Sequence, residues 1–219
     1  MTQPKIDVSI IRQAVTPNVA KAAYGVFREL RIASGSLYVP KAELAFSDTW
    51  LGSYGEAVET FAKDHCDQLA AIAKSQGVYD FHGFEIWTNL AVDCPTRVVV
   101  HVDNDEVHRA ATGEVRNPVL GSILHLGPDN LEQGGGTCFF LNSEKTTAHS
   151  DFLFQSTAWE TVRETIGYSA IEVPFHAGQM VIFRGDLAHC VIPFEKSHWG
   201  PRVAFLVNLW SRPLVSAAQ

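Results

Sequence analysis

Residues 96–105, TRVVVHVDND, join an apolar run to polar side chains at its end. Three successive valines favour an extended strand, and side chains two residues apart on a strand point to the same face. His101 and Asp103 are therefore expected to project side by side where the apolar run ends. An imidazole beside a carboxylate in such a position can hold a metal ion, provided that another ligand comes from elsewhere in the chain.

Further apolar runs follow on both sides of this segment, separated by Gly, Pro, Asp and Asn turn signals. With it they predict about eight strands. The predicted strands are residues 84–92, 96–103, 118–126, 136–141, 170–175, 179–183, 187–192 and 202–210. One helical pattern, residues 152–166, interrupts them. Short antiparallel strands in this number favour a double-sheet jelly roll.

The first part of the chain has a helical period instead. A helix is predicted from Thr16 and Pro17 towards Gly35, and a second from a capping box at Ser53 and Glu56 to Gly77. Helices followed by strands indicate an α+β fold, with a jelly-roll (double-stranded β-helix) core and N-terminal supporting helices. We expect a single domain over 1–219, in which 1–83 is mostly helical support and 84–210 is the core.

Composition excludes several classes of function. A net charge of -7 leaves no basic stripe for phosphates, which argues against a nucleic-acid partner. No apolar run approaches the roughly 20 residues that span a bilayer, and the N-terminus has no signal-peptide pattern, so we expect a cytoplasmic protein without a membrane partner. The four cysteines have no CxxC spacing and are expected to be reduced core residues.

His189 is the predicted third ligand. It lies in QMVIFRGDLAHCVIP, where a strand, a Gly-Asp turn and a second strand would bring it into the sheet interior. The rival histidines lack a strand on both sides. These are His108, His149, His176 and His198.

Arg202 begins the last apolar strand, thirteen residues after His189. A guanidinium that points into a barrel needs an anion, because an unpaired buried charge costs several kcal/mol. A dicarboxylate would supply it, since its keto-acid end can chelate a metal while its far carboxylate pairs with the guanidinium.

The ordered set His101, Asp103, His189 and Arg202 resembles the 2-oxoglutarate and Fe(II)-dependent oxygenase superfamily, in its prolyl-hydroxylase-like branch. That family shows a His-x-Asp, a distal His and a later basic residue. Between the ligands it also shows an apolar strand, an acidic turn, glycines and another strand, which is similar to SILHLGPDNLEQGGGTCFF here. The resemblance covers residues 84–210.

The resemblance implies a dioxygenase that binds Fe(II), consumes 2-oxoglutarate and O2, and releases succinate and CO2 as it hydroxylates a C–H bond. Ascorbate is a candidate reductant. One departure is Ala204, where the family often has Ser or Thr two residues after the basic anchor. His125, where relatives carry a tyrosine, is a candidate to replace that cosubstrate hydrogen bond, and a satisfied core histidine is the alternative.

Two other classes of protein remain open. A cupin-type metalloenzyme or metal-binding module is disfavoured because the typical His-x-His with a downstream Glu is absent. A catalytically silent jelly roll would make the four site residues coincidental. The compact chain favours a small-molecule or amino-acid substrate. Gly134, Gly135 and Gly136 predict a tight turn with positive φ, and Asp105 with Glu106 predict a solvated acidic face.

Overall fold

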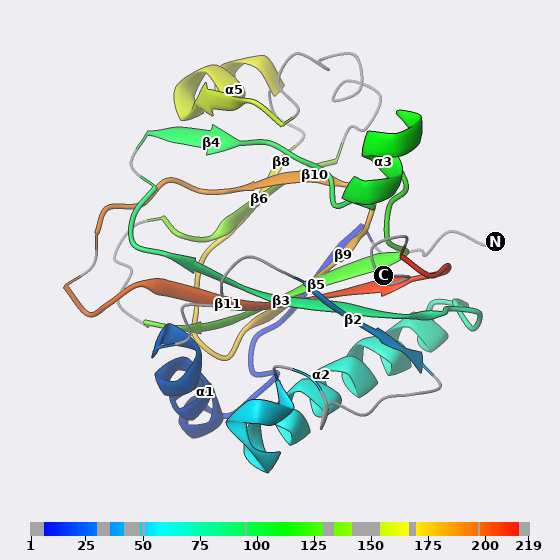
Figure 1. The fold of residues 1–219 in the computed structure, drawn as a ribbon. Coiled ribbons are helices and arrows are strands. Elements are labelled where there is room, and N and C mark those ends of the chain that lie inside the picture. Colours follow the sequence, from blue (N-terminus) through cyan, green and yellow to red (C-terminus); the bar gives the residue numbers. More distant parts are fainter. Residues whose placement is uncertain are drawn as a thin grey trace.

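The computed structural model describes residues 7–29, 36–41, 49, 51–94, 96–128, 134–141, 154–166, 170–196 and 198–214. Its largest element is a six-stranded antiparallel sheet, the major sheet, with the order β1-β9-β5-β11-β3-β2. Its strands are β1 (Val8–Ile11), β2 (Leu37–Pro40), β3 (Gly83–Ala91), β5 (Leu120–Gly127), β9 (Met180–Arg184) and β11 (Arg202–Trp210). Figure 1 shows these strands running through the middle of the molecule.

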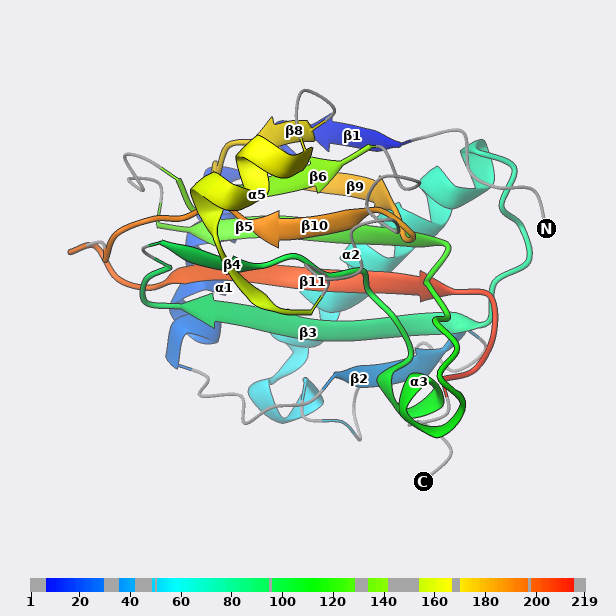
Figure 2. The same cartoon turned by 90° about the horizontal axis from the view of Figure 1, so that it is seen from above.

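A second layer faces the major sheet (Figures 1 and 2). It contains a three-stranded sheet of order β10-β6-β8 and a ribbon of β4 paired with β7. These strands are β4 (Arg97–Val99), β6 (Thr137–Phe140), β7 (Ser156–Ala158), β8 (Ala170–Val173) and β10 (Ala188–Val191). Two single β-bridges pair Cys94 with Phe194 and His101 with His189. They join the residues on either side of β4 to β10 and to the segment that follows it. The large antiparallel sheet and its facing layer are consistent with the expected jelly roll.

Two long helices, α1 (Pro17–Glu29) and α2 (Glu56–Ser75), cover the outer face of the major sheet. Apolar side chains alternate along β11, so that every second one packs against these helices. The Phe205 ring, for example, lies 5.4 Å from Phe27 and 5.1 Å from Phe61 between ring centroids. A second cluster fills the space between the layers, with Phe139 and Val173 from one sheet and Ile123, Phe183 and Ala204 from the other.

The structure corrects several expected boundaries in the first part of the chain. The capping box is wrong, because Ser53 lies in a short 3-10 helix, Gly52–Tyr54, and α2 begins after Gly55 without a side-chain cap. The stretch 1–83 also contributes β1 and β2, which lie at the two edges of the major sheet. Edge strands of four residues carry too little alternation to be predicted.

Three further differences from the expected boundaries lie later in the chain. The strand predicted over 96–103 ends at Val99, and a short helix follows, α3 (Glu106–Thr112). The helix predicted over 152–166 begins only at Trp159, as α5 (Trp159–Ile166), because the residues before it form β7 and pair with β4. No helix in the described ranges has the length and apolarity that a membrane span requires.

Candidate metal centre and arginine pocket

His101 and His189 are brought together by backbone pairing. They form an antiparallel bridge in which each backbone N–H donates to the carbonyl of the other, at N···O distances of 3.0 and 2.8 Å. Residues paired in this way project their side chains to the same side, and the two ring centroids lie 4.4 Å apart. The expected strand through His101 is reduced to this single bridge, which is sufficient to align the two imidazoles.

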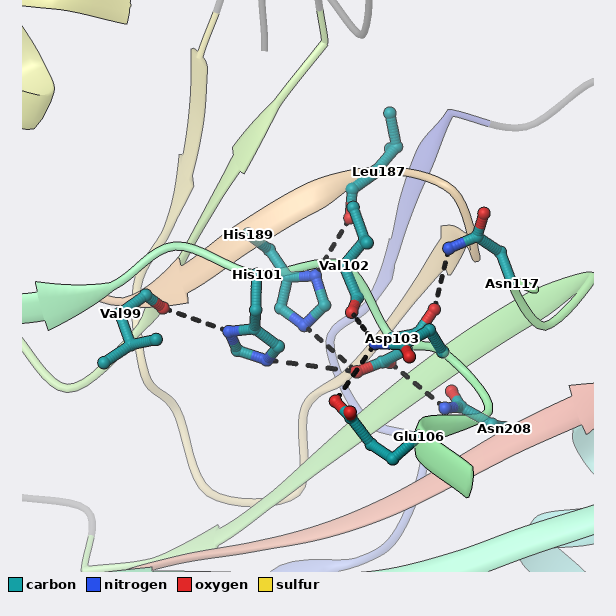
Figure 3. Close-up of polar contacts among 10 residues, drawn as sticks. Val99, His101, Val102, Asp103, Glu106, Asn117, Leu187, His189 and Asn208 are labelled. Carbon is teal, nitrogen blue, oxygen red and sulfur yellow. Dashed lines mark hydrogen bonds and ion pairs between the residues drawn. The ribbon is translucent and has the colours of Figure 1, made fainter. Parts of the chain in front are cut away.

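Asp103 completes the cluster (Figure 3). Its Oδ1 lies 3.9 Å from His101 Nε2 and 3.8 Å from His189 Nε2. These distances are too long for direct hydrogen bonds, whereas two metal bonds of roughly 2.1 Å can span such a gap. The Asn208 amide donates to Asp103 Oδ2 at 3.1 Å, and the Asn117 amide donates to the Asp103 carbonyl at 2.8 Å. The carboxylate is therefore held from β11, and the backbone of Asp103 is held from the loop before β5.

Each imidazole is oriented by a carbonyl two residues before it. His101 Nδ1 lies 3.0 Å from the Val99 carbonyl, and His189 Nδ1 lies 3.0 Å from the Leu187 carbonyl. A carbonyl only accepts, so both Nδ1 atoms carry the proton and both Nε2 atoms face Asp103 with a free lone pair. This outer hydrogen bond is the arrangement found behind metal-binding histidines.

Burial and, to a lesser extent, His101 lower the pKa of His189 to about 4, although Asp103 and the Leu187 carbonyl oppose the shift. The ring is therefore neutral at pH 7, which is the form that binds metals. Two neutral imidazoles and one carboxylate are the donor set of Fe(II) facial-triad sites, so the residues present fit that ion.

The rival histidines lie elsewhere. His108 is buried in α3 and contacts Glu114 and Thr112, with Nε2 3.2 Å from the Glu114 carboxylate and 3.2 Å from Thr112 Oγ1. His176 and His198 are exposed, and the metal-binding group found among the described residues contains neither. His149 lies outside the described residues.

Arg202 is 2% exposed and has no acidic partner within the described ranges. Its Nε donates to the Gly135 carbonyl, one terminal nitrogen donates to Asn89 Oδ1 at 3.2 Å, and the guanidinium carbon lies 5.3 Å from the centre of the Phe175 ring. Burial lowers the pKa of Arg202 to about 10, so the group is still charged at pH 7. A buried cation with only neutral contacts makes this position an anion site.

The glycine turn takes part in this pocket. Gly134 and Gly135 have positive φ, as expected, and a Cβ on Gly136 would lie 2.0 Å from the Val173 carbonyl. The turn therefore fits only glycine there, and it presents the Gly135 carbonyl to Arg202.

His125 is fully buried and stacks on Phe175, with ring centroids 4.3 Å apart. Its Nδ1 accepts from the His176 backbone N–H at 3.4 Å, which leaves the proton on Nε2, an atom that has no hydrogen-bond partner among the described residues. Burial, with Arg202 and His176, lowers the pKa of His125, so the ring is neutral. It lies directly across from Ala204 in the β5–β11 register. The neutral ring of His125 therefore places an N–H donor next to Ala204, the position where Ser or Thr would have supplied a hydroxyl group.

Thr137 is a second orphaned group that the sequence did not indicate. Its Oγ1 is buried, and in the part of the chain that the structure describes it has no hydrogen-bond partner. On β6 it shares a face with Phe139, which packs between the layers against Ala204. Buried polar atoms are rarely left unpaired, so Thr137 and His125 both indicate that a polar ligand belongs between the sheets near Arg202.

A cavity of about 360 Å³ opens beside the metal cluster. Glu85, Trp87 and Asn208 line it from the major sheet, and Val99, Glu106 and Phe154 line it from the other side. The alternation along β3 and β11 could have placed Glu85, Trp87 and Asn208 inside, because they share a face with Asn89 and Arg202. A larger cavity, about 660 Å³, lies between α1 and α2, away from these groups.

No protein-family model matches the sequence, and no curated protein matches it. Solved structures do match its fold. A prolyl-4-hydroxylase from Pseudomonas putida has 15% identity and a TM-score of 0.58, over 95% of this chain and 87% of that chain. The non-heme alpha ketoglutarate dependent epimerase SnoN from nogalamycin biosynthesis has 14% identity and a TM-score of 0.56, over 95% and 82%.

A prolyl hydroxylase from Trichoplax adhaerens, solved with a peptide of hypoxia inducible factor, has 11% identity and a TM-score of 0.55, over 98% and 88%. The chain thus has the fold of the prolyl-hydroxylase-like 2-oxoglutarate and Fe(II)-dependent oxygenases. At identities of 11 to 15% the likeness defines the fold alone, so the activity has to be argued from this chain's own residues.

Proposed function

We propose that the chain is an Fe(II)- and 2-oxoglutarate-dependent dioxygenase that hydroxylates a C–H bond of a small molecule or amino acid. The observation that carries the proposal is the pairing of two sites in one interior. Three potential ligand atoms converge beside Asn208 of β11, and the buried guanidinium of Arg202, which has no acidic partner in the described part of the chain, lies on the same face of that strand. A dicarboxylate that also chelates a metal would satisfy both sites.

His101, Asp103 and His189 would hold the ion, and the carbonyls of Val99 and Leu187 would keep both Nε2 lone pairs directed at it. Bound iron with 2-oxoglutarate and O2 supplies the oxidising power to attack an unactivated C–H bond, with succinate and CO2 as coproducts. Asn208 fixes the second carboxylate oxygen of Asp103, which limits its rotation.

Arg202 would bind the far carboxylate of 2-oxoglutarate, and His125 Nε2–H with Thr137 would complete its hydrogen bonds. The anchor is close to the metal cluster, because Ala204, two residues along β11, packs in one cluster with Phe139 and Phe183, whose rings contact His189.

The direct test is anaerobic titration of 2-oxoglutarate into Fe(II)-loaded protein, followed through the visible charge-transfer band of a chelated keto acid. Succinate release is then measured in air, with ascorbate, across a panel of small molecules and amino acids. Arg202→Leu should weaken 2-oxoglutarate binding about tenfold to a hundredfold, which corresponds to a charge-assisted bond of roughly 1.5 to 3 kcal/mol. The affinity of Arg202→Lys for 2-oxoglutarate should lie between that of the parent protein and that of Arg202→Leu.

A matched control is Arg184→Gln on β9. Arg184 is also a strand arginine, but Asp7 and Asp186 already compensate its charge. This variant should bind 2-oxoglutarate as the parent does. Unchanged affinity in Arg202→Leu would remove the anchor, and metal binding without any keto-acid band in the parent would leave a metal-binding jelly roll instead.

A further inference from the structure

Glu85 is the one acidic group of the 360 Å³ cavity that no metal or cation accounts for in the described structure. Among the described residues that line this cavity, three are acidic and none is Lys or Arg. Asp103 belongs to the metal cluster. Glu106 is exposed and already paired, with its carboxylate 2.6 Å from Arg109 and 3.1 Å from the Asn104 amide.

The position of Glu85 is set by sheet register. It lies opposite Asn208 in the β3–β11 pairing, and Asn208 in turn holds Asp103. Glu85 therefore stands next to the metal cluster on the floor of the cavity. Trp87, two residues further along β3, shares the same face and lines the same cavity.

The carboxyl group of Glu85 is partly buried and held only by neutral donors within the described ranges. Trp210 Nε1 donates to Glu85 Oε2 at 3.1 Å, and Ser36 and Asn208 also form hydrogen bonds with it. Burial raises the pKa of Glu85 despite these bonds, and Asp103 adds to the rise. A partly buried carboxylate held only by neutral donors is stabilised when a ligand places a cation beside it.

We infer that the substrate of this cavity carries a protonated amine, which pairs with the Glu85 carboxylate against the Trp87 ring. The inference rests on the proposed function, because it takes this cavity as the place where the substrate meets the metal. A volume of about 360 Å³ lies at the small end of ligand pockets of roughly 300–1,000 Å³. The amine therefore belongs to a small molecule or to a single side chain of a peptide.

The experiment uses the full chain loaded with Fe(II) and 2-oxoglutarate in the absence of O2. Binding of piperidine and cyclohexylamine is compared by calorimetry with that of their neutral counterparts, tetrahydropyran and cyclohexanol. A tripeptide with a central lysine, and its norleucine counterpart, form a separate arm that distinguishes a peptide source from a free amine. Each cation should bind at least about tenfold more tightly than its neutral counterpart.

Glu85→Gln keeps the size of the side chain and an oxygen that accepts from Trp210, but removes the charge. It should abolish the preference for amines, and Glu85→Asp should keep part of it. The matched control is Glu106→Gln, because this carboxylate lines the same cavity but is paired with Arg109. It should reduce the preference by less than about threefold.

Equal binding of amines and neutral counterparts, or equal losses in Glu85→Gln and Glu106→Gln, would overturn the inference. The charge-transfer band of the keto acid is recorded on the same samples and shows that each variant is folded. A normal band without amine preference leaves the proposed function standing and rejects the role of Glu85. Absence of the band rejects the proposed function itself.

Discussion

The outer face of β11 presents Val203, Phe205 and Val207 to the long helices, whereas the inner face presents Arg202, Ala204 and Asn208 to the space between the sheets. The outer side chains pack mainly against apolar neighbours, so their burial stabilises the fold. The inner face buries a charge and an amide, and the hydrogen bonds to Gly135, Asn89 and Asp103 leave the charge of Arg202 without a counter-ion in the described ranges. Alternate residues of β11 therefore have different roles. Those on the outer face stabilise the fold, and those on the inner face line the candidate site.

The largest expected effect lies on the inner side. Asp103→Ala removes the only carboxylate of the metal cluster, so Fe(II) binding should be lost while the fold persists. Asp103→Glu should also bind poorly, because one added methylene displaces the carboxylate from the two Nε2 atoms. Anaerobic equilibrium dialysis with Fe(II) measures both, and urea unfolding checks the fold. Retained binding in Asp103→Ala would show that this residue is not a ligand.

The outer face should respond in the opposite way. Phe205→Ala removes a ring that contacts Phe27, Phe61 and His65, and should lower the free energy of unfolding by about 3 to 5 kcal/mol. The folded fraction should bind Fe(II) as before. Trp199→Ala is the control, because its side chain is 56% exposed and should cost less than about 0.5 kcal/mol. A large loss of metal affinity in folded Phe205→Ala would break the separation of the two faces.

Acid should lower the free energy of unfolding through His65, a buried residue of α2. Burial lowers the pKa of His65 to about 4, below the ordinary value near 6.5, so the unfolded chain takes up a proton first. Stability is therefore fully present above pH 6.5 and falls as the pH drops towards 4, by up to about 3 kcal/mol. His65→Gln should flatten this dependence, as measured by urea unfolding at several pH values. An unchanged slope would assign the acid sensitivity to other groups.

The smallest effect is expected at Asn208, on the inner face. Asn208→Leu removes the bond to Asp103 Oδ2 without touching the three ligand side chains, so Fe(II) affinity should fall about tenfold. The free energy of unfolding of the metal-free protein should fall by about 1 to 3 kcal/mol, because the carboxyl groups of Asp103 and Glu85 each lose a hydrogen-bond donor. Full affinity in this variant would mean that Asn117 and the local backbone suffice to hold Asp103.

The sequence predicted the parts of the molecule that depend on local pattern. The apolar period of two located eight strands of the two layers, and the His-x-Asp spacing indicated two of the three residues whose potential ligand atoms lie together. Asn208 and Glu85 were missed because their partners, Asp103 and Trp210, lie 105 and 125 residues away along the chain. Such contacts are set by the register between distant strands, which no local period contains.

The capping box failed for a related reason. Ser53 and Glu56 have the right spacing, but the backbone turns at Gly55 with φ of 94°, and the helix begins there instead. The acidic pair was also misread, because Asp105 is 4% exposed and caps α3 by accepting from the His108 N–H at 3.0 Å. Capping geometry depends on dihedral angles that residue type constrains only weakly.

The bridge between His101 and His189 has a mechanical consequence. In the described part of the chain, the β4–β7 ribbon is joined to the β10 side by only two backbone bridges, and one of them carries both imidazoles. An ion held by those imidazoles would cross-link the segment that follows β4 to β10. Separation of the ribbon from β10 would then require loss of the ion. The rate of amide hydrogen exchange at His101 and His189 would therefore fall as the fraction of protein that holds the ion rises.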